Sequence, residues 1–215
     1  MKTPDDYSIN TAYSYSDSSE LADYYDDSAN GYDEYADSVG YVLPRLVAQK
    51  ASQFINGDET IIDIGCGTGI LGVELNLIRD GLRIDGLDIS PKMIVQAYGK
   101  KKLDGKRNYE MFHYLDLTSE DIFPENEYNF MVSSGTFTTG HLDGVHLSKM
   151  ITAMKSGSIA VFSVKSDHFD ISGFMDKLIN LENNGLIEML EIVEVDSYEN
   201  HNYTAMSKIV SIKIA

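Results

Sequence analysis

The sequence predicts an α/β fold built on a doubly wound, mostly parallel sheet of seven strands. Three observations predict it. Short β-branched runs alternate with amphipathic segments of helical length, a glycine-rich turn follows the first of these runs, and the last two runs have no helix between them. The chain has 215 residues and 43% hydrophobic content, which suits one domain with a sizeable core.

The expected elements follow in chain order. Helices are predicted at 40–54, 69–79, 91–102, 142–153 and 170–182, and strands at 60–64, 83–88, 109–113, 128–134, 158–164, 187–197 and 203–214. A hairpin at 198–202 would make one of the last two strands antiparallel. Ligands of such sheets bind outside the carboxyl ends of the strands, where the strand order reverses. We therefore expect Gly65, Asp88, Asp116 and Ser133 at one edge of the sheet.

The segment 60–91, TIIDIGCGTGILGVELNLIRDGLRIDGLDISP, has the form of a nucleoside-binding β-turn-α-β unit. Its turn carries Gly65, Gly67 and Gly69, which can take positive φ and approach a ligand closely, so that backbone N–H groups face the ligand. Ile70 stands where the third glycine of the dinucleotide pattern G-x-G-x-x-G would lie. The spacing therefore opposes a dinucleotide.

An acidic residue ends the second strand. Asp88 lies 19 residues after Gly69, where a carboxylate can hold the two hydroxyls of a ribose. The alternative is that Asp88 caps the next helix, but Ser90 and Pro91 already form a capping signal there. With Asp63 before the glycines, Asp88 favours a nucleoside site over plain turn chemistry.

Taken together, these residues resemble the class I S-adenosylmethionine-dependent methyltransferases. The stretches similar to that family's five successive motifs are DIGCGTG at 63–69, GLDIS at 86–90, HYLDL at 113–117, YNFMVSSGTF at 128–137 and KSGSIAVFSVK at 155–165. YDDSANGYDEYA at 25–36 and SGTFTTGH at 134–141 look most like the Williams–Beuren-region methyltransferase-like proteins, although Ser28 replaces the tryptophan of Y-D-x-W-A-x-x-Y-D. The resemblance implies a Rossmann-like sheet and S-adenosylmethionine as cofactor, with S-adenosylhomocysteine as product.

The residues predicted to contact the cofactor are Tyr25, Tyr32, Asp63, Gly65, Cys66, Gly67, Thr68, Gly69, Asp88, Ile89, Met93, Asp116, Leu117, Ser133 and Ser134. The resemblance implies that Asp116 receives the adenine amino group and that the Leu117 amide faces the ring; an Asx turn is the alternative for Asp116. Met93 is explained equally well as a core residue. Cys66 is better explained as a small residue that the turn accepts than as a nucleophile.

Residues 1–38 carry ten acidic residues and a single lysine. Residues 1–18 are predicted to form a disordered acidic arm, because they have little to bury against the entropy of ordering them. Residues 19–215 would form the methyltransferase domain, with 19–56 as a helical cap. That cap either only packs on the sheet or closes over the site as a lid through Tyr25 and Tyr32.

The formal net charge of −17 disfavours nucleic acid, an anionic membrane or an acidic substrate as a bulk partner and leaves small neutral or cationic acceptors open. The local basic run at 100–107 is typical of a solvated helix end. No apolar stretch approaches the roughly 18–20 residues that span a bilayer, and the N-terminus is polar and acidic, unlike a signal peptide. We expect a cytoplasmic monomer or homodimer.

Methyl transfer from a sulfonium requires alignment above all, and a base only if the acceptor arrives protonated. His141 is the best candidate base, because the reference pKa of histidine is near 6.5; a lone loop histidine is more often a plain hydrogen-bonding residue. No histidine pair has the spacing of a zinc site, so no metal is predicted. The alternatives are a cofactor-binding protein without transferase activity, an enzyme using S-adenosylmethionine for a different reaction and, opposed by Ile70, an NAD-dependent oxidoreductase.

Overall fold

The computed structural model describes residues 9–12, 15, 17–102, 104–119, 121–125, 127–200 and 202–215. Its sheet has the order β3-β2-β1-β4-β5-β7-β6. The strands are β1 (Thr60–Ile64), β2 (Arg83–Asp88), β3 (Phe112–Tyr114), β4 (Phe130–Phe137), β5 (Ile159–Lys165), β6 (Ile187–Asp196) and β7 (Met206–Ile214). Neighbours among β1 to β5 pair in parallel, whereas β7 pairs antiparallel with both β5 and β6. The predicted fold, including the inserted antiparallel strand, is confirmed.

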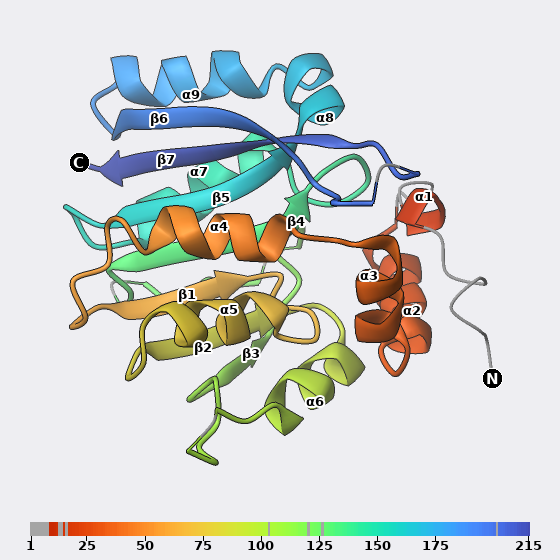
Figure 1. Cartoon of the computed structure of the whole chain (residues 1–215). Helices are drawn as coiled ribbons and strands as arrows, with labels where there is room; N and C mark the ends of the chain where they lie inside the picture. Colours follow the sequence, from red (N-terminus) through yellow and green to blue (C-terminus); the bar gives the residue numbers. More distant parts are fainter. Residues whose placement is uncertain are drawn as a thin grey trace.

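Helices cover both faces of this sheet (Figure 1). They are α1 (Ile9–Ala12), α2 (Ser18–Ser28), α3 (Tyr32–Val39), α4 (Leu43–Ala51), α5 (Ile70–Ile78), α6 (Pro91–Gly99), α7 (Gly144–Ala153), α8 (Ser166–Ile171) and α9 (Phe174–Asn183). In Figure 1, α2 and α3 stand beside the edge at which β1 and β4 end. No helix within the described ranges is long and apolar enough to cross a membrane.

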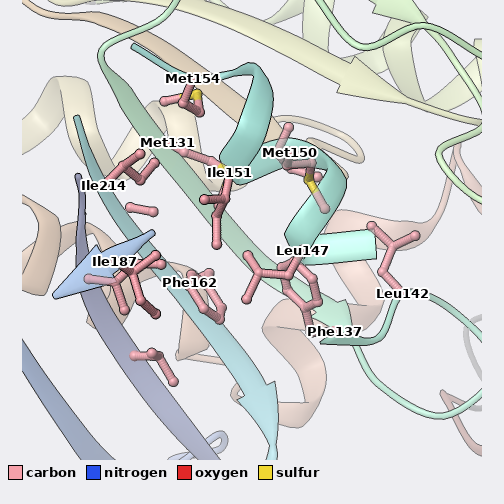
Figure 2. Packing of buried hydrophobic residues seen from close by; sticks show 14 of the residues in the cluster. Met131, Phe137, Leu142, Leu147, Met150, Ile151, Met154, Phe162, Ile187 and Ile214 are labelled. Carbon is pink, nitrogen blue, oxygen red and sulfur yellow. The ribbon is translucent and has the colours of Figure 1, made fainter. Parts of the chain in front are cut away.

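Two apolar clusters hold the layers together. On one face, α4 and α5 pack on the sheet through residues such as Val47 and Leu75. On the other face, Leu147 and Ile151 of α7 pack against Phe162 of β5, as Figure 2 shows. Because β1, β5 and the first half of β4 are buried on both faces, their sequences are mostly apolar, and this pattern made them recognisable.

Glycines in the left-handed region explain the two largest differences from the predicted helices. Gly40, at φ 68°, ends α3, and α4 begins only at Leu43, so the helix predicted at 40–54 is shorter. Gly173, at φ 70°, divides the helix predicted at 170–182 into α8 and α9. Apolar residues recur on both sides of each glycine, so the periodicity of the sequence predicts one helix that runs across it. The left-handed conformation of the glycine ends the helix instead.

Other boundaries differ by a few residues. The strand predicted at 109–113 begins at Phe112, because Tyr109 turns inward beneath α5. The strand predicted at 128–134 extends to Phe137 through a break in its register with β5. Within the arm predicted at 1–18, the structure has α1; residues 1–8, 13, 14 and 16 of that prediction, and His201 of the predicted hairpin, lie outside the described residues.

Candidate active site

A cavity of about 420 Å³ is lined by residues at the carboxyl ends of the strands and by residues of α2 and α3. This volume is within the range of small-molecule sites. The predicted site residues that line it are Tyr25, Tyr32, Gly65, Gly67, Asp88, Ile89, Met93, Asp116, Leu117, Ser134 and His141. Residues from five separate parts of the chain therefore meet at the edge that the strand order predicts.

The turn after β1 depends on glycine. Gly65 has φ 65° and Gly67 has φ 53°, in the left-handed region that favours glycine. A Cβ on Gly65 would lie 2.2 Å from the Oγ1 of Thr136, so β4 and the turn approach too closely for any side chain. A Cβ on Gly67 would meet nothing within 4 Å, which means that conformation alone calls for glycine there.

Asp88 connects the turn to the second strand. Its carboxylate accepts hydrogen bonds from the backbone N–H of Gly67 at 2.7 Å and of Ser90 at 2.8 Å. Ser90, in turn, caps α6, because its Oγ accepts from the Met93 N–H at 3.1 Å. Ser90 therefore fills the N-cap position of α6, and Asp88 is not required as its cap. Burial raises the pKa of Asp88 to about 6, so a largely ionised carboxylate faces the cavity at neutral pH.

Five predicted cofactor residues lie behind the cavity wall instead of lining it: Asp63, Cys66, Thr68, Gly69 and Ser133. Asp63 is fully buried and accepts a hydrogen bond from the Tyr109 hydroxyl at 2.6 Å. Ser133 donates to the Ile64 carbonyl at 2.7 Å. Burial raises the pKa of the Cys66 thiol, which keeps it protonated and agrees with a packing role. Asp63 and Ser133 therefore stabilise the strands beside the turn without lining the cavity.

We expect replacement of Asp63 to change the pH dependence of stability. Burial raises its pKa from 3.8 to about 7, so the folded state holds a proton that the unfolded chain releases, and stability falls as pH rises through this window. Asp63→Asn removes this titration. In urea unfolding, the wild type should lose up to roughly 1.4 kcal/mol per pH unit more than the variant between pH 4 and 7. Parallel pH profiles would contradict the assignment.

The cap is bound to the cofactor loops by its carboxylates. On α2, Asp26 accepts from the Ser90 hydroxyl at 2.6 Å and from the Lys92 N–H at 3.1 Å. On α3, Asp33 accepts from the Thr68 hydroxyl at 2.5 Å and pairs with Lys100 at 2.5 Å. Part of the acidity of the N-terminal region is therefore used in direct contacts with the turn and with both ends of α6.

His141 meets the cap at the cavity wall. Its Nε2 lies 2.8 Å from the Tyr25 hydroxyl, and its Nδ1 lies 3.2 Å from the Thr139 carbonyl. Burial lowers the pKa of His141, so the imidazole is neutral at physiological pH. Donation from Nδ1 to the carbonyl leaves Nε2 as the acceptor for Tyr25. This arrangement gives a neutral base with a defined tautomer next to a phenol.

Asp116 forms the predicted Asx turn at the cavity, and its contact with adenine stays a prediction. It lines the cavity, and its Oδ1 also accepts from the N–H of Thr118 at 2.8 Å and from its hydroxyl at 2.6 Å, which is an Asx turn. Ser18 of α2 donates to the same carboxylate. The turn fixes the carboxylate at the cavity and does not exclude a ligand contact.

The sequence prediction missed several residues that line the cavity: Ser18, Leu21, Ile64, Leu87, Leu115, Thr118, Gly135, Thr136, Gly140, Leu142 and His146. Ile64, Leu87 and Leu115 stand directly before the predicted site residues Gly65, Asp88 and Asp116. Their sequence position could therefore have indicated that they lie at the cavity. Ser18 and Leu21 had no such signal, because only the packing of α2 brings them to the cavity.

The basic run at 100–107 is largely neutralised by neighbours. Lys100 pairs with Asp33, Lys102 with Asp80 at 4.0 Å and Lys106 with Asp104 at 2.9 Å. Among the described residues, no group of three His, Cys, Asp or Glu side chains is placed to hold a metal ion.

Comparison with known proteins agrees with this geometry. The family model described as "Methyltransferase domain" matches residues 55–205. This chain belongs to that family. The predicted assignment to the class I S-adenosylmethionine-dependent methyltransferases is confirmed for the family as a whole, without a subfamily.

Similar proteins extend the comparison. The malonyl-[acyl-carrier protein] O-methyltransferase 2 of Ilyobacter polytropus is 31% identical over 66% of this chain, and the chain spans only 53% of that protein's length. The magnesium protoporphyrin IX methyltransferase of Synechocystis PCC 6803, solved with bound S-adenosylmethionine, has a TM-score of 0.64 and 15% identity, covering 92% of this chain and 97% of its own. The [4+2]-cyclase SpnF has a TM-score of 0.67 at 15% identity, covering 93% and 97%. At such identity the two structures show a shared fold only.

Proposed function

We propose that this protein transfers a methyl group from S-adenosylmethionine to a small-molecule acceptor. The observation that carries the proposal is the buried carboxylate of Asp88, which faces a cavity of about 420 Å³ beside the glycine turn. Membership of the methyltransferase family indicates that the reaction is methyl transfer. When bound, S-adenosylmethionine supplies a methyl group already activated by its sulfonium.

The lining of the cavity fits a nucleoside. Asp88 accepts hydrogen bonds from the ribose hydroxyls, Asp116 and the Leu117 amide hold the adenine, and Ile89 and Met93 form its apolar walls. The buried hydroxyl of Ser134 has no hydrogen-bond partner among the described residues, so a polar group of the cofactor can satisfy it. Tyr25 and Tyr32 close the cavity as a lid. Asp63, Cys66, Thr68, Gly69 and Ser133 shape the turn from behind.

His141 takes the role of base in this proposal when the acceptor arrives as a hydroxyl. Its neutral imidazole and the Tyr25 hydroxyl form a hydrogen-bonded pair at the cavity wall that can receive a proton. An acceptor that arrives already ionised needs no base.

The finer predictions belong to the same proposal. The names of the curated relatives support an oxygen as the accepting atom, on a free or carrier-bound molecule. The segments 25–36 and 134–141 support a closer relation to the Williams–Beuren-region proteins. The net charge supports the absence of nucleic acid and of anionic membranes as partners. A cytoplasmic location, a monomer or homodimer, the acidic arm at 1–18 and the cap at 19–56 remain predictions.

Isothermal titration with S-adenosylmethionine, S-adenosylhomocysteine and NADH tests the proposal. We expect micromolar binding of the first two and none of NADH. Absence of binding to S-adenosylmethionine would contradict the proposal, and NADH binding in its place would revive the oxidoreductase alternative. Incubation with acceptors must then yield S-adenosylhomocysteine, because the likeness to a cyclase shows that the fold also serves other reactions.

The lid has its own test in two truncations. Deleting residues 1–17 keeps α2 and α3, so we expect little change in affinity for S-adenosylmethionine. Deleting 1–35 removes Tyr25 and Tyr32 together with the contacts of Asp26 and Asp33, and we expect about a tenfold or greater loss. Equal affinities, measured by titration calorimetry on two folded truncations, would mean that the segment is a structural cap only.

A further inference from the structure

A second, smaller chamber of about 50 Å³ adjoins the cofactor cavity. Both spaces are lined by Tyr25, Tyr32 and Gly135, so they share part of their walls. Residues at the ends of β4 and β5 and residues of α2 and α3 line much of the rest of the chamber. Roughly 10–15 Å³ holds one water, so the chamber has room for one end of a small molecule. A group held there lies next to the space in which the cofactor would bind.

The wall of this chamber is rich in hydroxyl groups. Most of the described residues that line it are tyrosines and serines, together with Thr138. No Asp or Glu among the described residues lines it, and its charged residue, Lys165, already pairs with Asp167 at 2.9 Å. An ion that entered the chamber would lose water without gaining a new partner of opposite charge, which is costly. The chamber therefore favours an uncharged polar group.

An unsatisfied hydroxyl points to a ligand in the chamber. Thr138 is 3% exposed, and its Oγ1 has no hydrogen-bond partner among the described residues. Thr138 begins a turn that ends at His141, whose backbone N–H donates to the Thr138 carbonyl at 3.0 Å. Thr138 lines the chamber, and His141 lines the cavity. A ligand hydroxyl in the chamber can pair with Oγ1, which removes the cost of burying it unpaired.

Tyr25 connects the chamber to His141. It lines both spaces, and its hydroxyl lies 2.8 Å from the His141 Nε2. The His141 Nδ1 lies 3.2 Å from the Thr139 carbonyl and donates to it, so Nε2 accepts the Tyr25 proton. The lone pairs of the Tyr25 oxygen therefore point away from His141. A hydroxyl in the chamber thus meets the Tyr25 oxygen before it meets the histidine.

We propose that the acceptor is an uncharged hydroxyl compound and that Tyr25 is a catalytic residue, which takes the acceptor proton and passes its own proton to His141. The proposal rests on the proposed function and adds the acceptor class and the order of proton transfer. The acceptor oxygen forms the bond to the methyl carbon as the carbon–sulfur bond breaks, and the electron pair of that bond stays on sulfur, which becomes a neutral thioether. The acceptor proton moves to the Tyr25 oxygen while the Tyr25 proton moves to the His141 Nε2. The reaction yields a methyl ether and an imidazolium, which returns its proton to water.

Protein-observed NMR tests the acceptor class. Propan-1-ol, acetate and propylammonium, which are similar in size, are titrated into the full chain with and without S-adenosylhomocysteine. Shifts are followed at the amides of Gly135 and Ser163, which line the chamber. We expect propan-1-ol to bind about tenfold more tightly than either ion, and Thr138→Val to weaken it about fivefold. Equal affinities, tighter binding of either ion, or no shift of these amides with propan-1-ol would overturn the acceptor class.

Turnover tests the role of Tyr25. Formation of S-adenosylhomocysteine is measured with S-adenosylmethionine and propan-1-ol, each at saturating concentration. We expect Tyr25→Phe to lower kcat about a hundredfold and to change the affinity for S-adenosylmethionine less than about twofold, because the ring that closes the cavity is kept. Tyr114→Phe is the matched control, since Tyr114 on β3 is 65% exposed and lines neither space, and it should keep the wild-type kcat.

Two further measurements separate proton transfer from a structural contact. The wild-type rate should be slower in D₂O than in H₂O, because a proton moves as the methyl group is transferred, and Tyr25→Phe should lose this difference. His141→Gln should be about as slow as Tyr25→Phe, and the double variant no slower than either, since groups that act as a unit give non-additive losses. Unchanged kcat in folded Tyr25→Phe, or losses that multiply in the double variant, would overturn the assignment of Tyr25.

The cofactor titration separates the two levels of inference. Binding of S-adenosylmethionine without binding or turnover of propan-1-ol refutes the acceptor class and leaves methyl transfer standing. Propan-1-ol binding at the chamber without S-adenosylmethionine binding refutes the proposed function, and the role of Tyr25 with it.

Discussion

Replacing Asp88 with alanine should weaken S-adenosylmethionine binding by roughly 10- to 150-fold. Hydrogen bonds to a charged group contribute about 1.5–3 kcal/mol, and every 1.4 kcal/mol is about tenfold in affinity. The variant also removes the acceptor for the Gly67 and Ser90 N–H groups, so the turn itself loosens. Titration calorimetry measures the affinity, and circular dichroism checks that the variant is folded.

Asp85→Ala is the matched control for this experiment. Asp85 lies on the same strand and accepts from the Met111 N–H at 3.0 Å and from the Tyr128 hydroxyl at 2.9 Å, but it does not line the cavity. Its replacement should reduce stability and leave affinity unchanged. Equal affinity losses in the two variants would remove the ribose assignment of Asp88.

The wild-type affinity should also depend on pH through Asp88. The ionised carboxylate binds the ribose, and its pKa in the free protein is about 6. Affinity should therefore be constant above that pH and fall by up to about tenfold per unit below it. Asp88→Ala should lose this dependence, whereas Asp85→Ala should keep it. A flat wild-type profile between pH 5 and 8 would contradict a role for the ionised carboxylate.

Replacing Gly72 with alanine should destabilise the protein by about 3 kcal/mol, although alanine is ordinarily the better helix former. Gly72 lies in α5 directly beneath Tyr109, and a Cβ there would be 2.4 Å from its Cζ. Tyr109 is 1% exposed and cannot move away without breaking its hydrogen bond to the buried Asp63. The clash and the lost hydrogen bond act together. Urea unfolding gives the change in free energy.

Gly99→Ala is the corresponding control. Gly99 is the last residue of α6, and a Cβ there would meet nothing within 4 Å. This change should be neutral or stabilise the protein by up to about 1 kcal/mol, since it lowers the entropy of the unfolded chain. If Gly72→Ala were as stable as Gly99→Ala, Tyr109 would not be packed as described.

The sequence by itself determined the sheet, the family and the cofactor edge. β1 and β2 begin and end as predicted at 60–64 and 83–88, because both are short runs bounded by turn residues. The glycines between them are required by the backbone conformation of the turn, which is a local property of the sequence. The meeting of the glycine turn, Asp88 and Asp116 at one edge followed from the parallel topology alone.

Only the tertiary structure decided which of the predicted residues face the cavity. Asp63 at the end of β1, and Cys66 and Thr68 in the turn, are neighbours of Gly65 and Gly67 but do not line the cavity, and the sequence gives no sign of this difference. The same holds for the contact of Tyr25 with His141. The physical reason is that such contacts depend on how elements distant in the sequence pack together. Turns and strands, in contrast, are specified mainly by residues adjacent to them in the sequence.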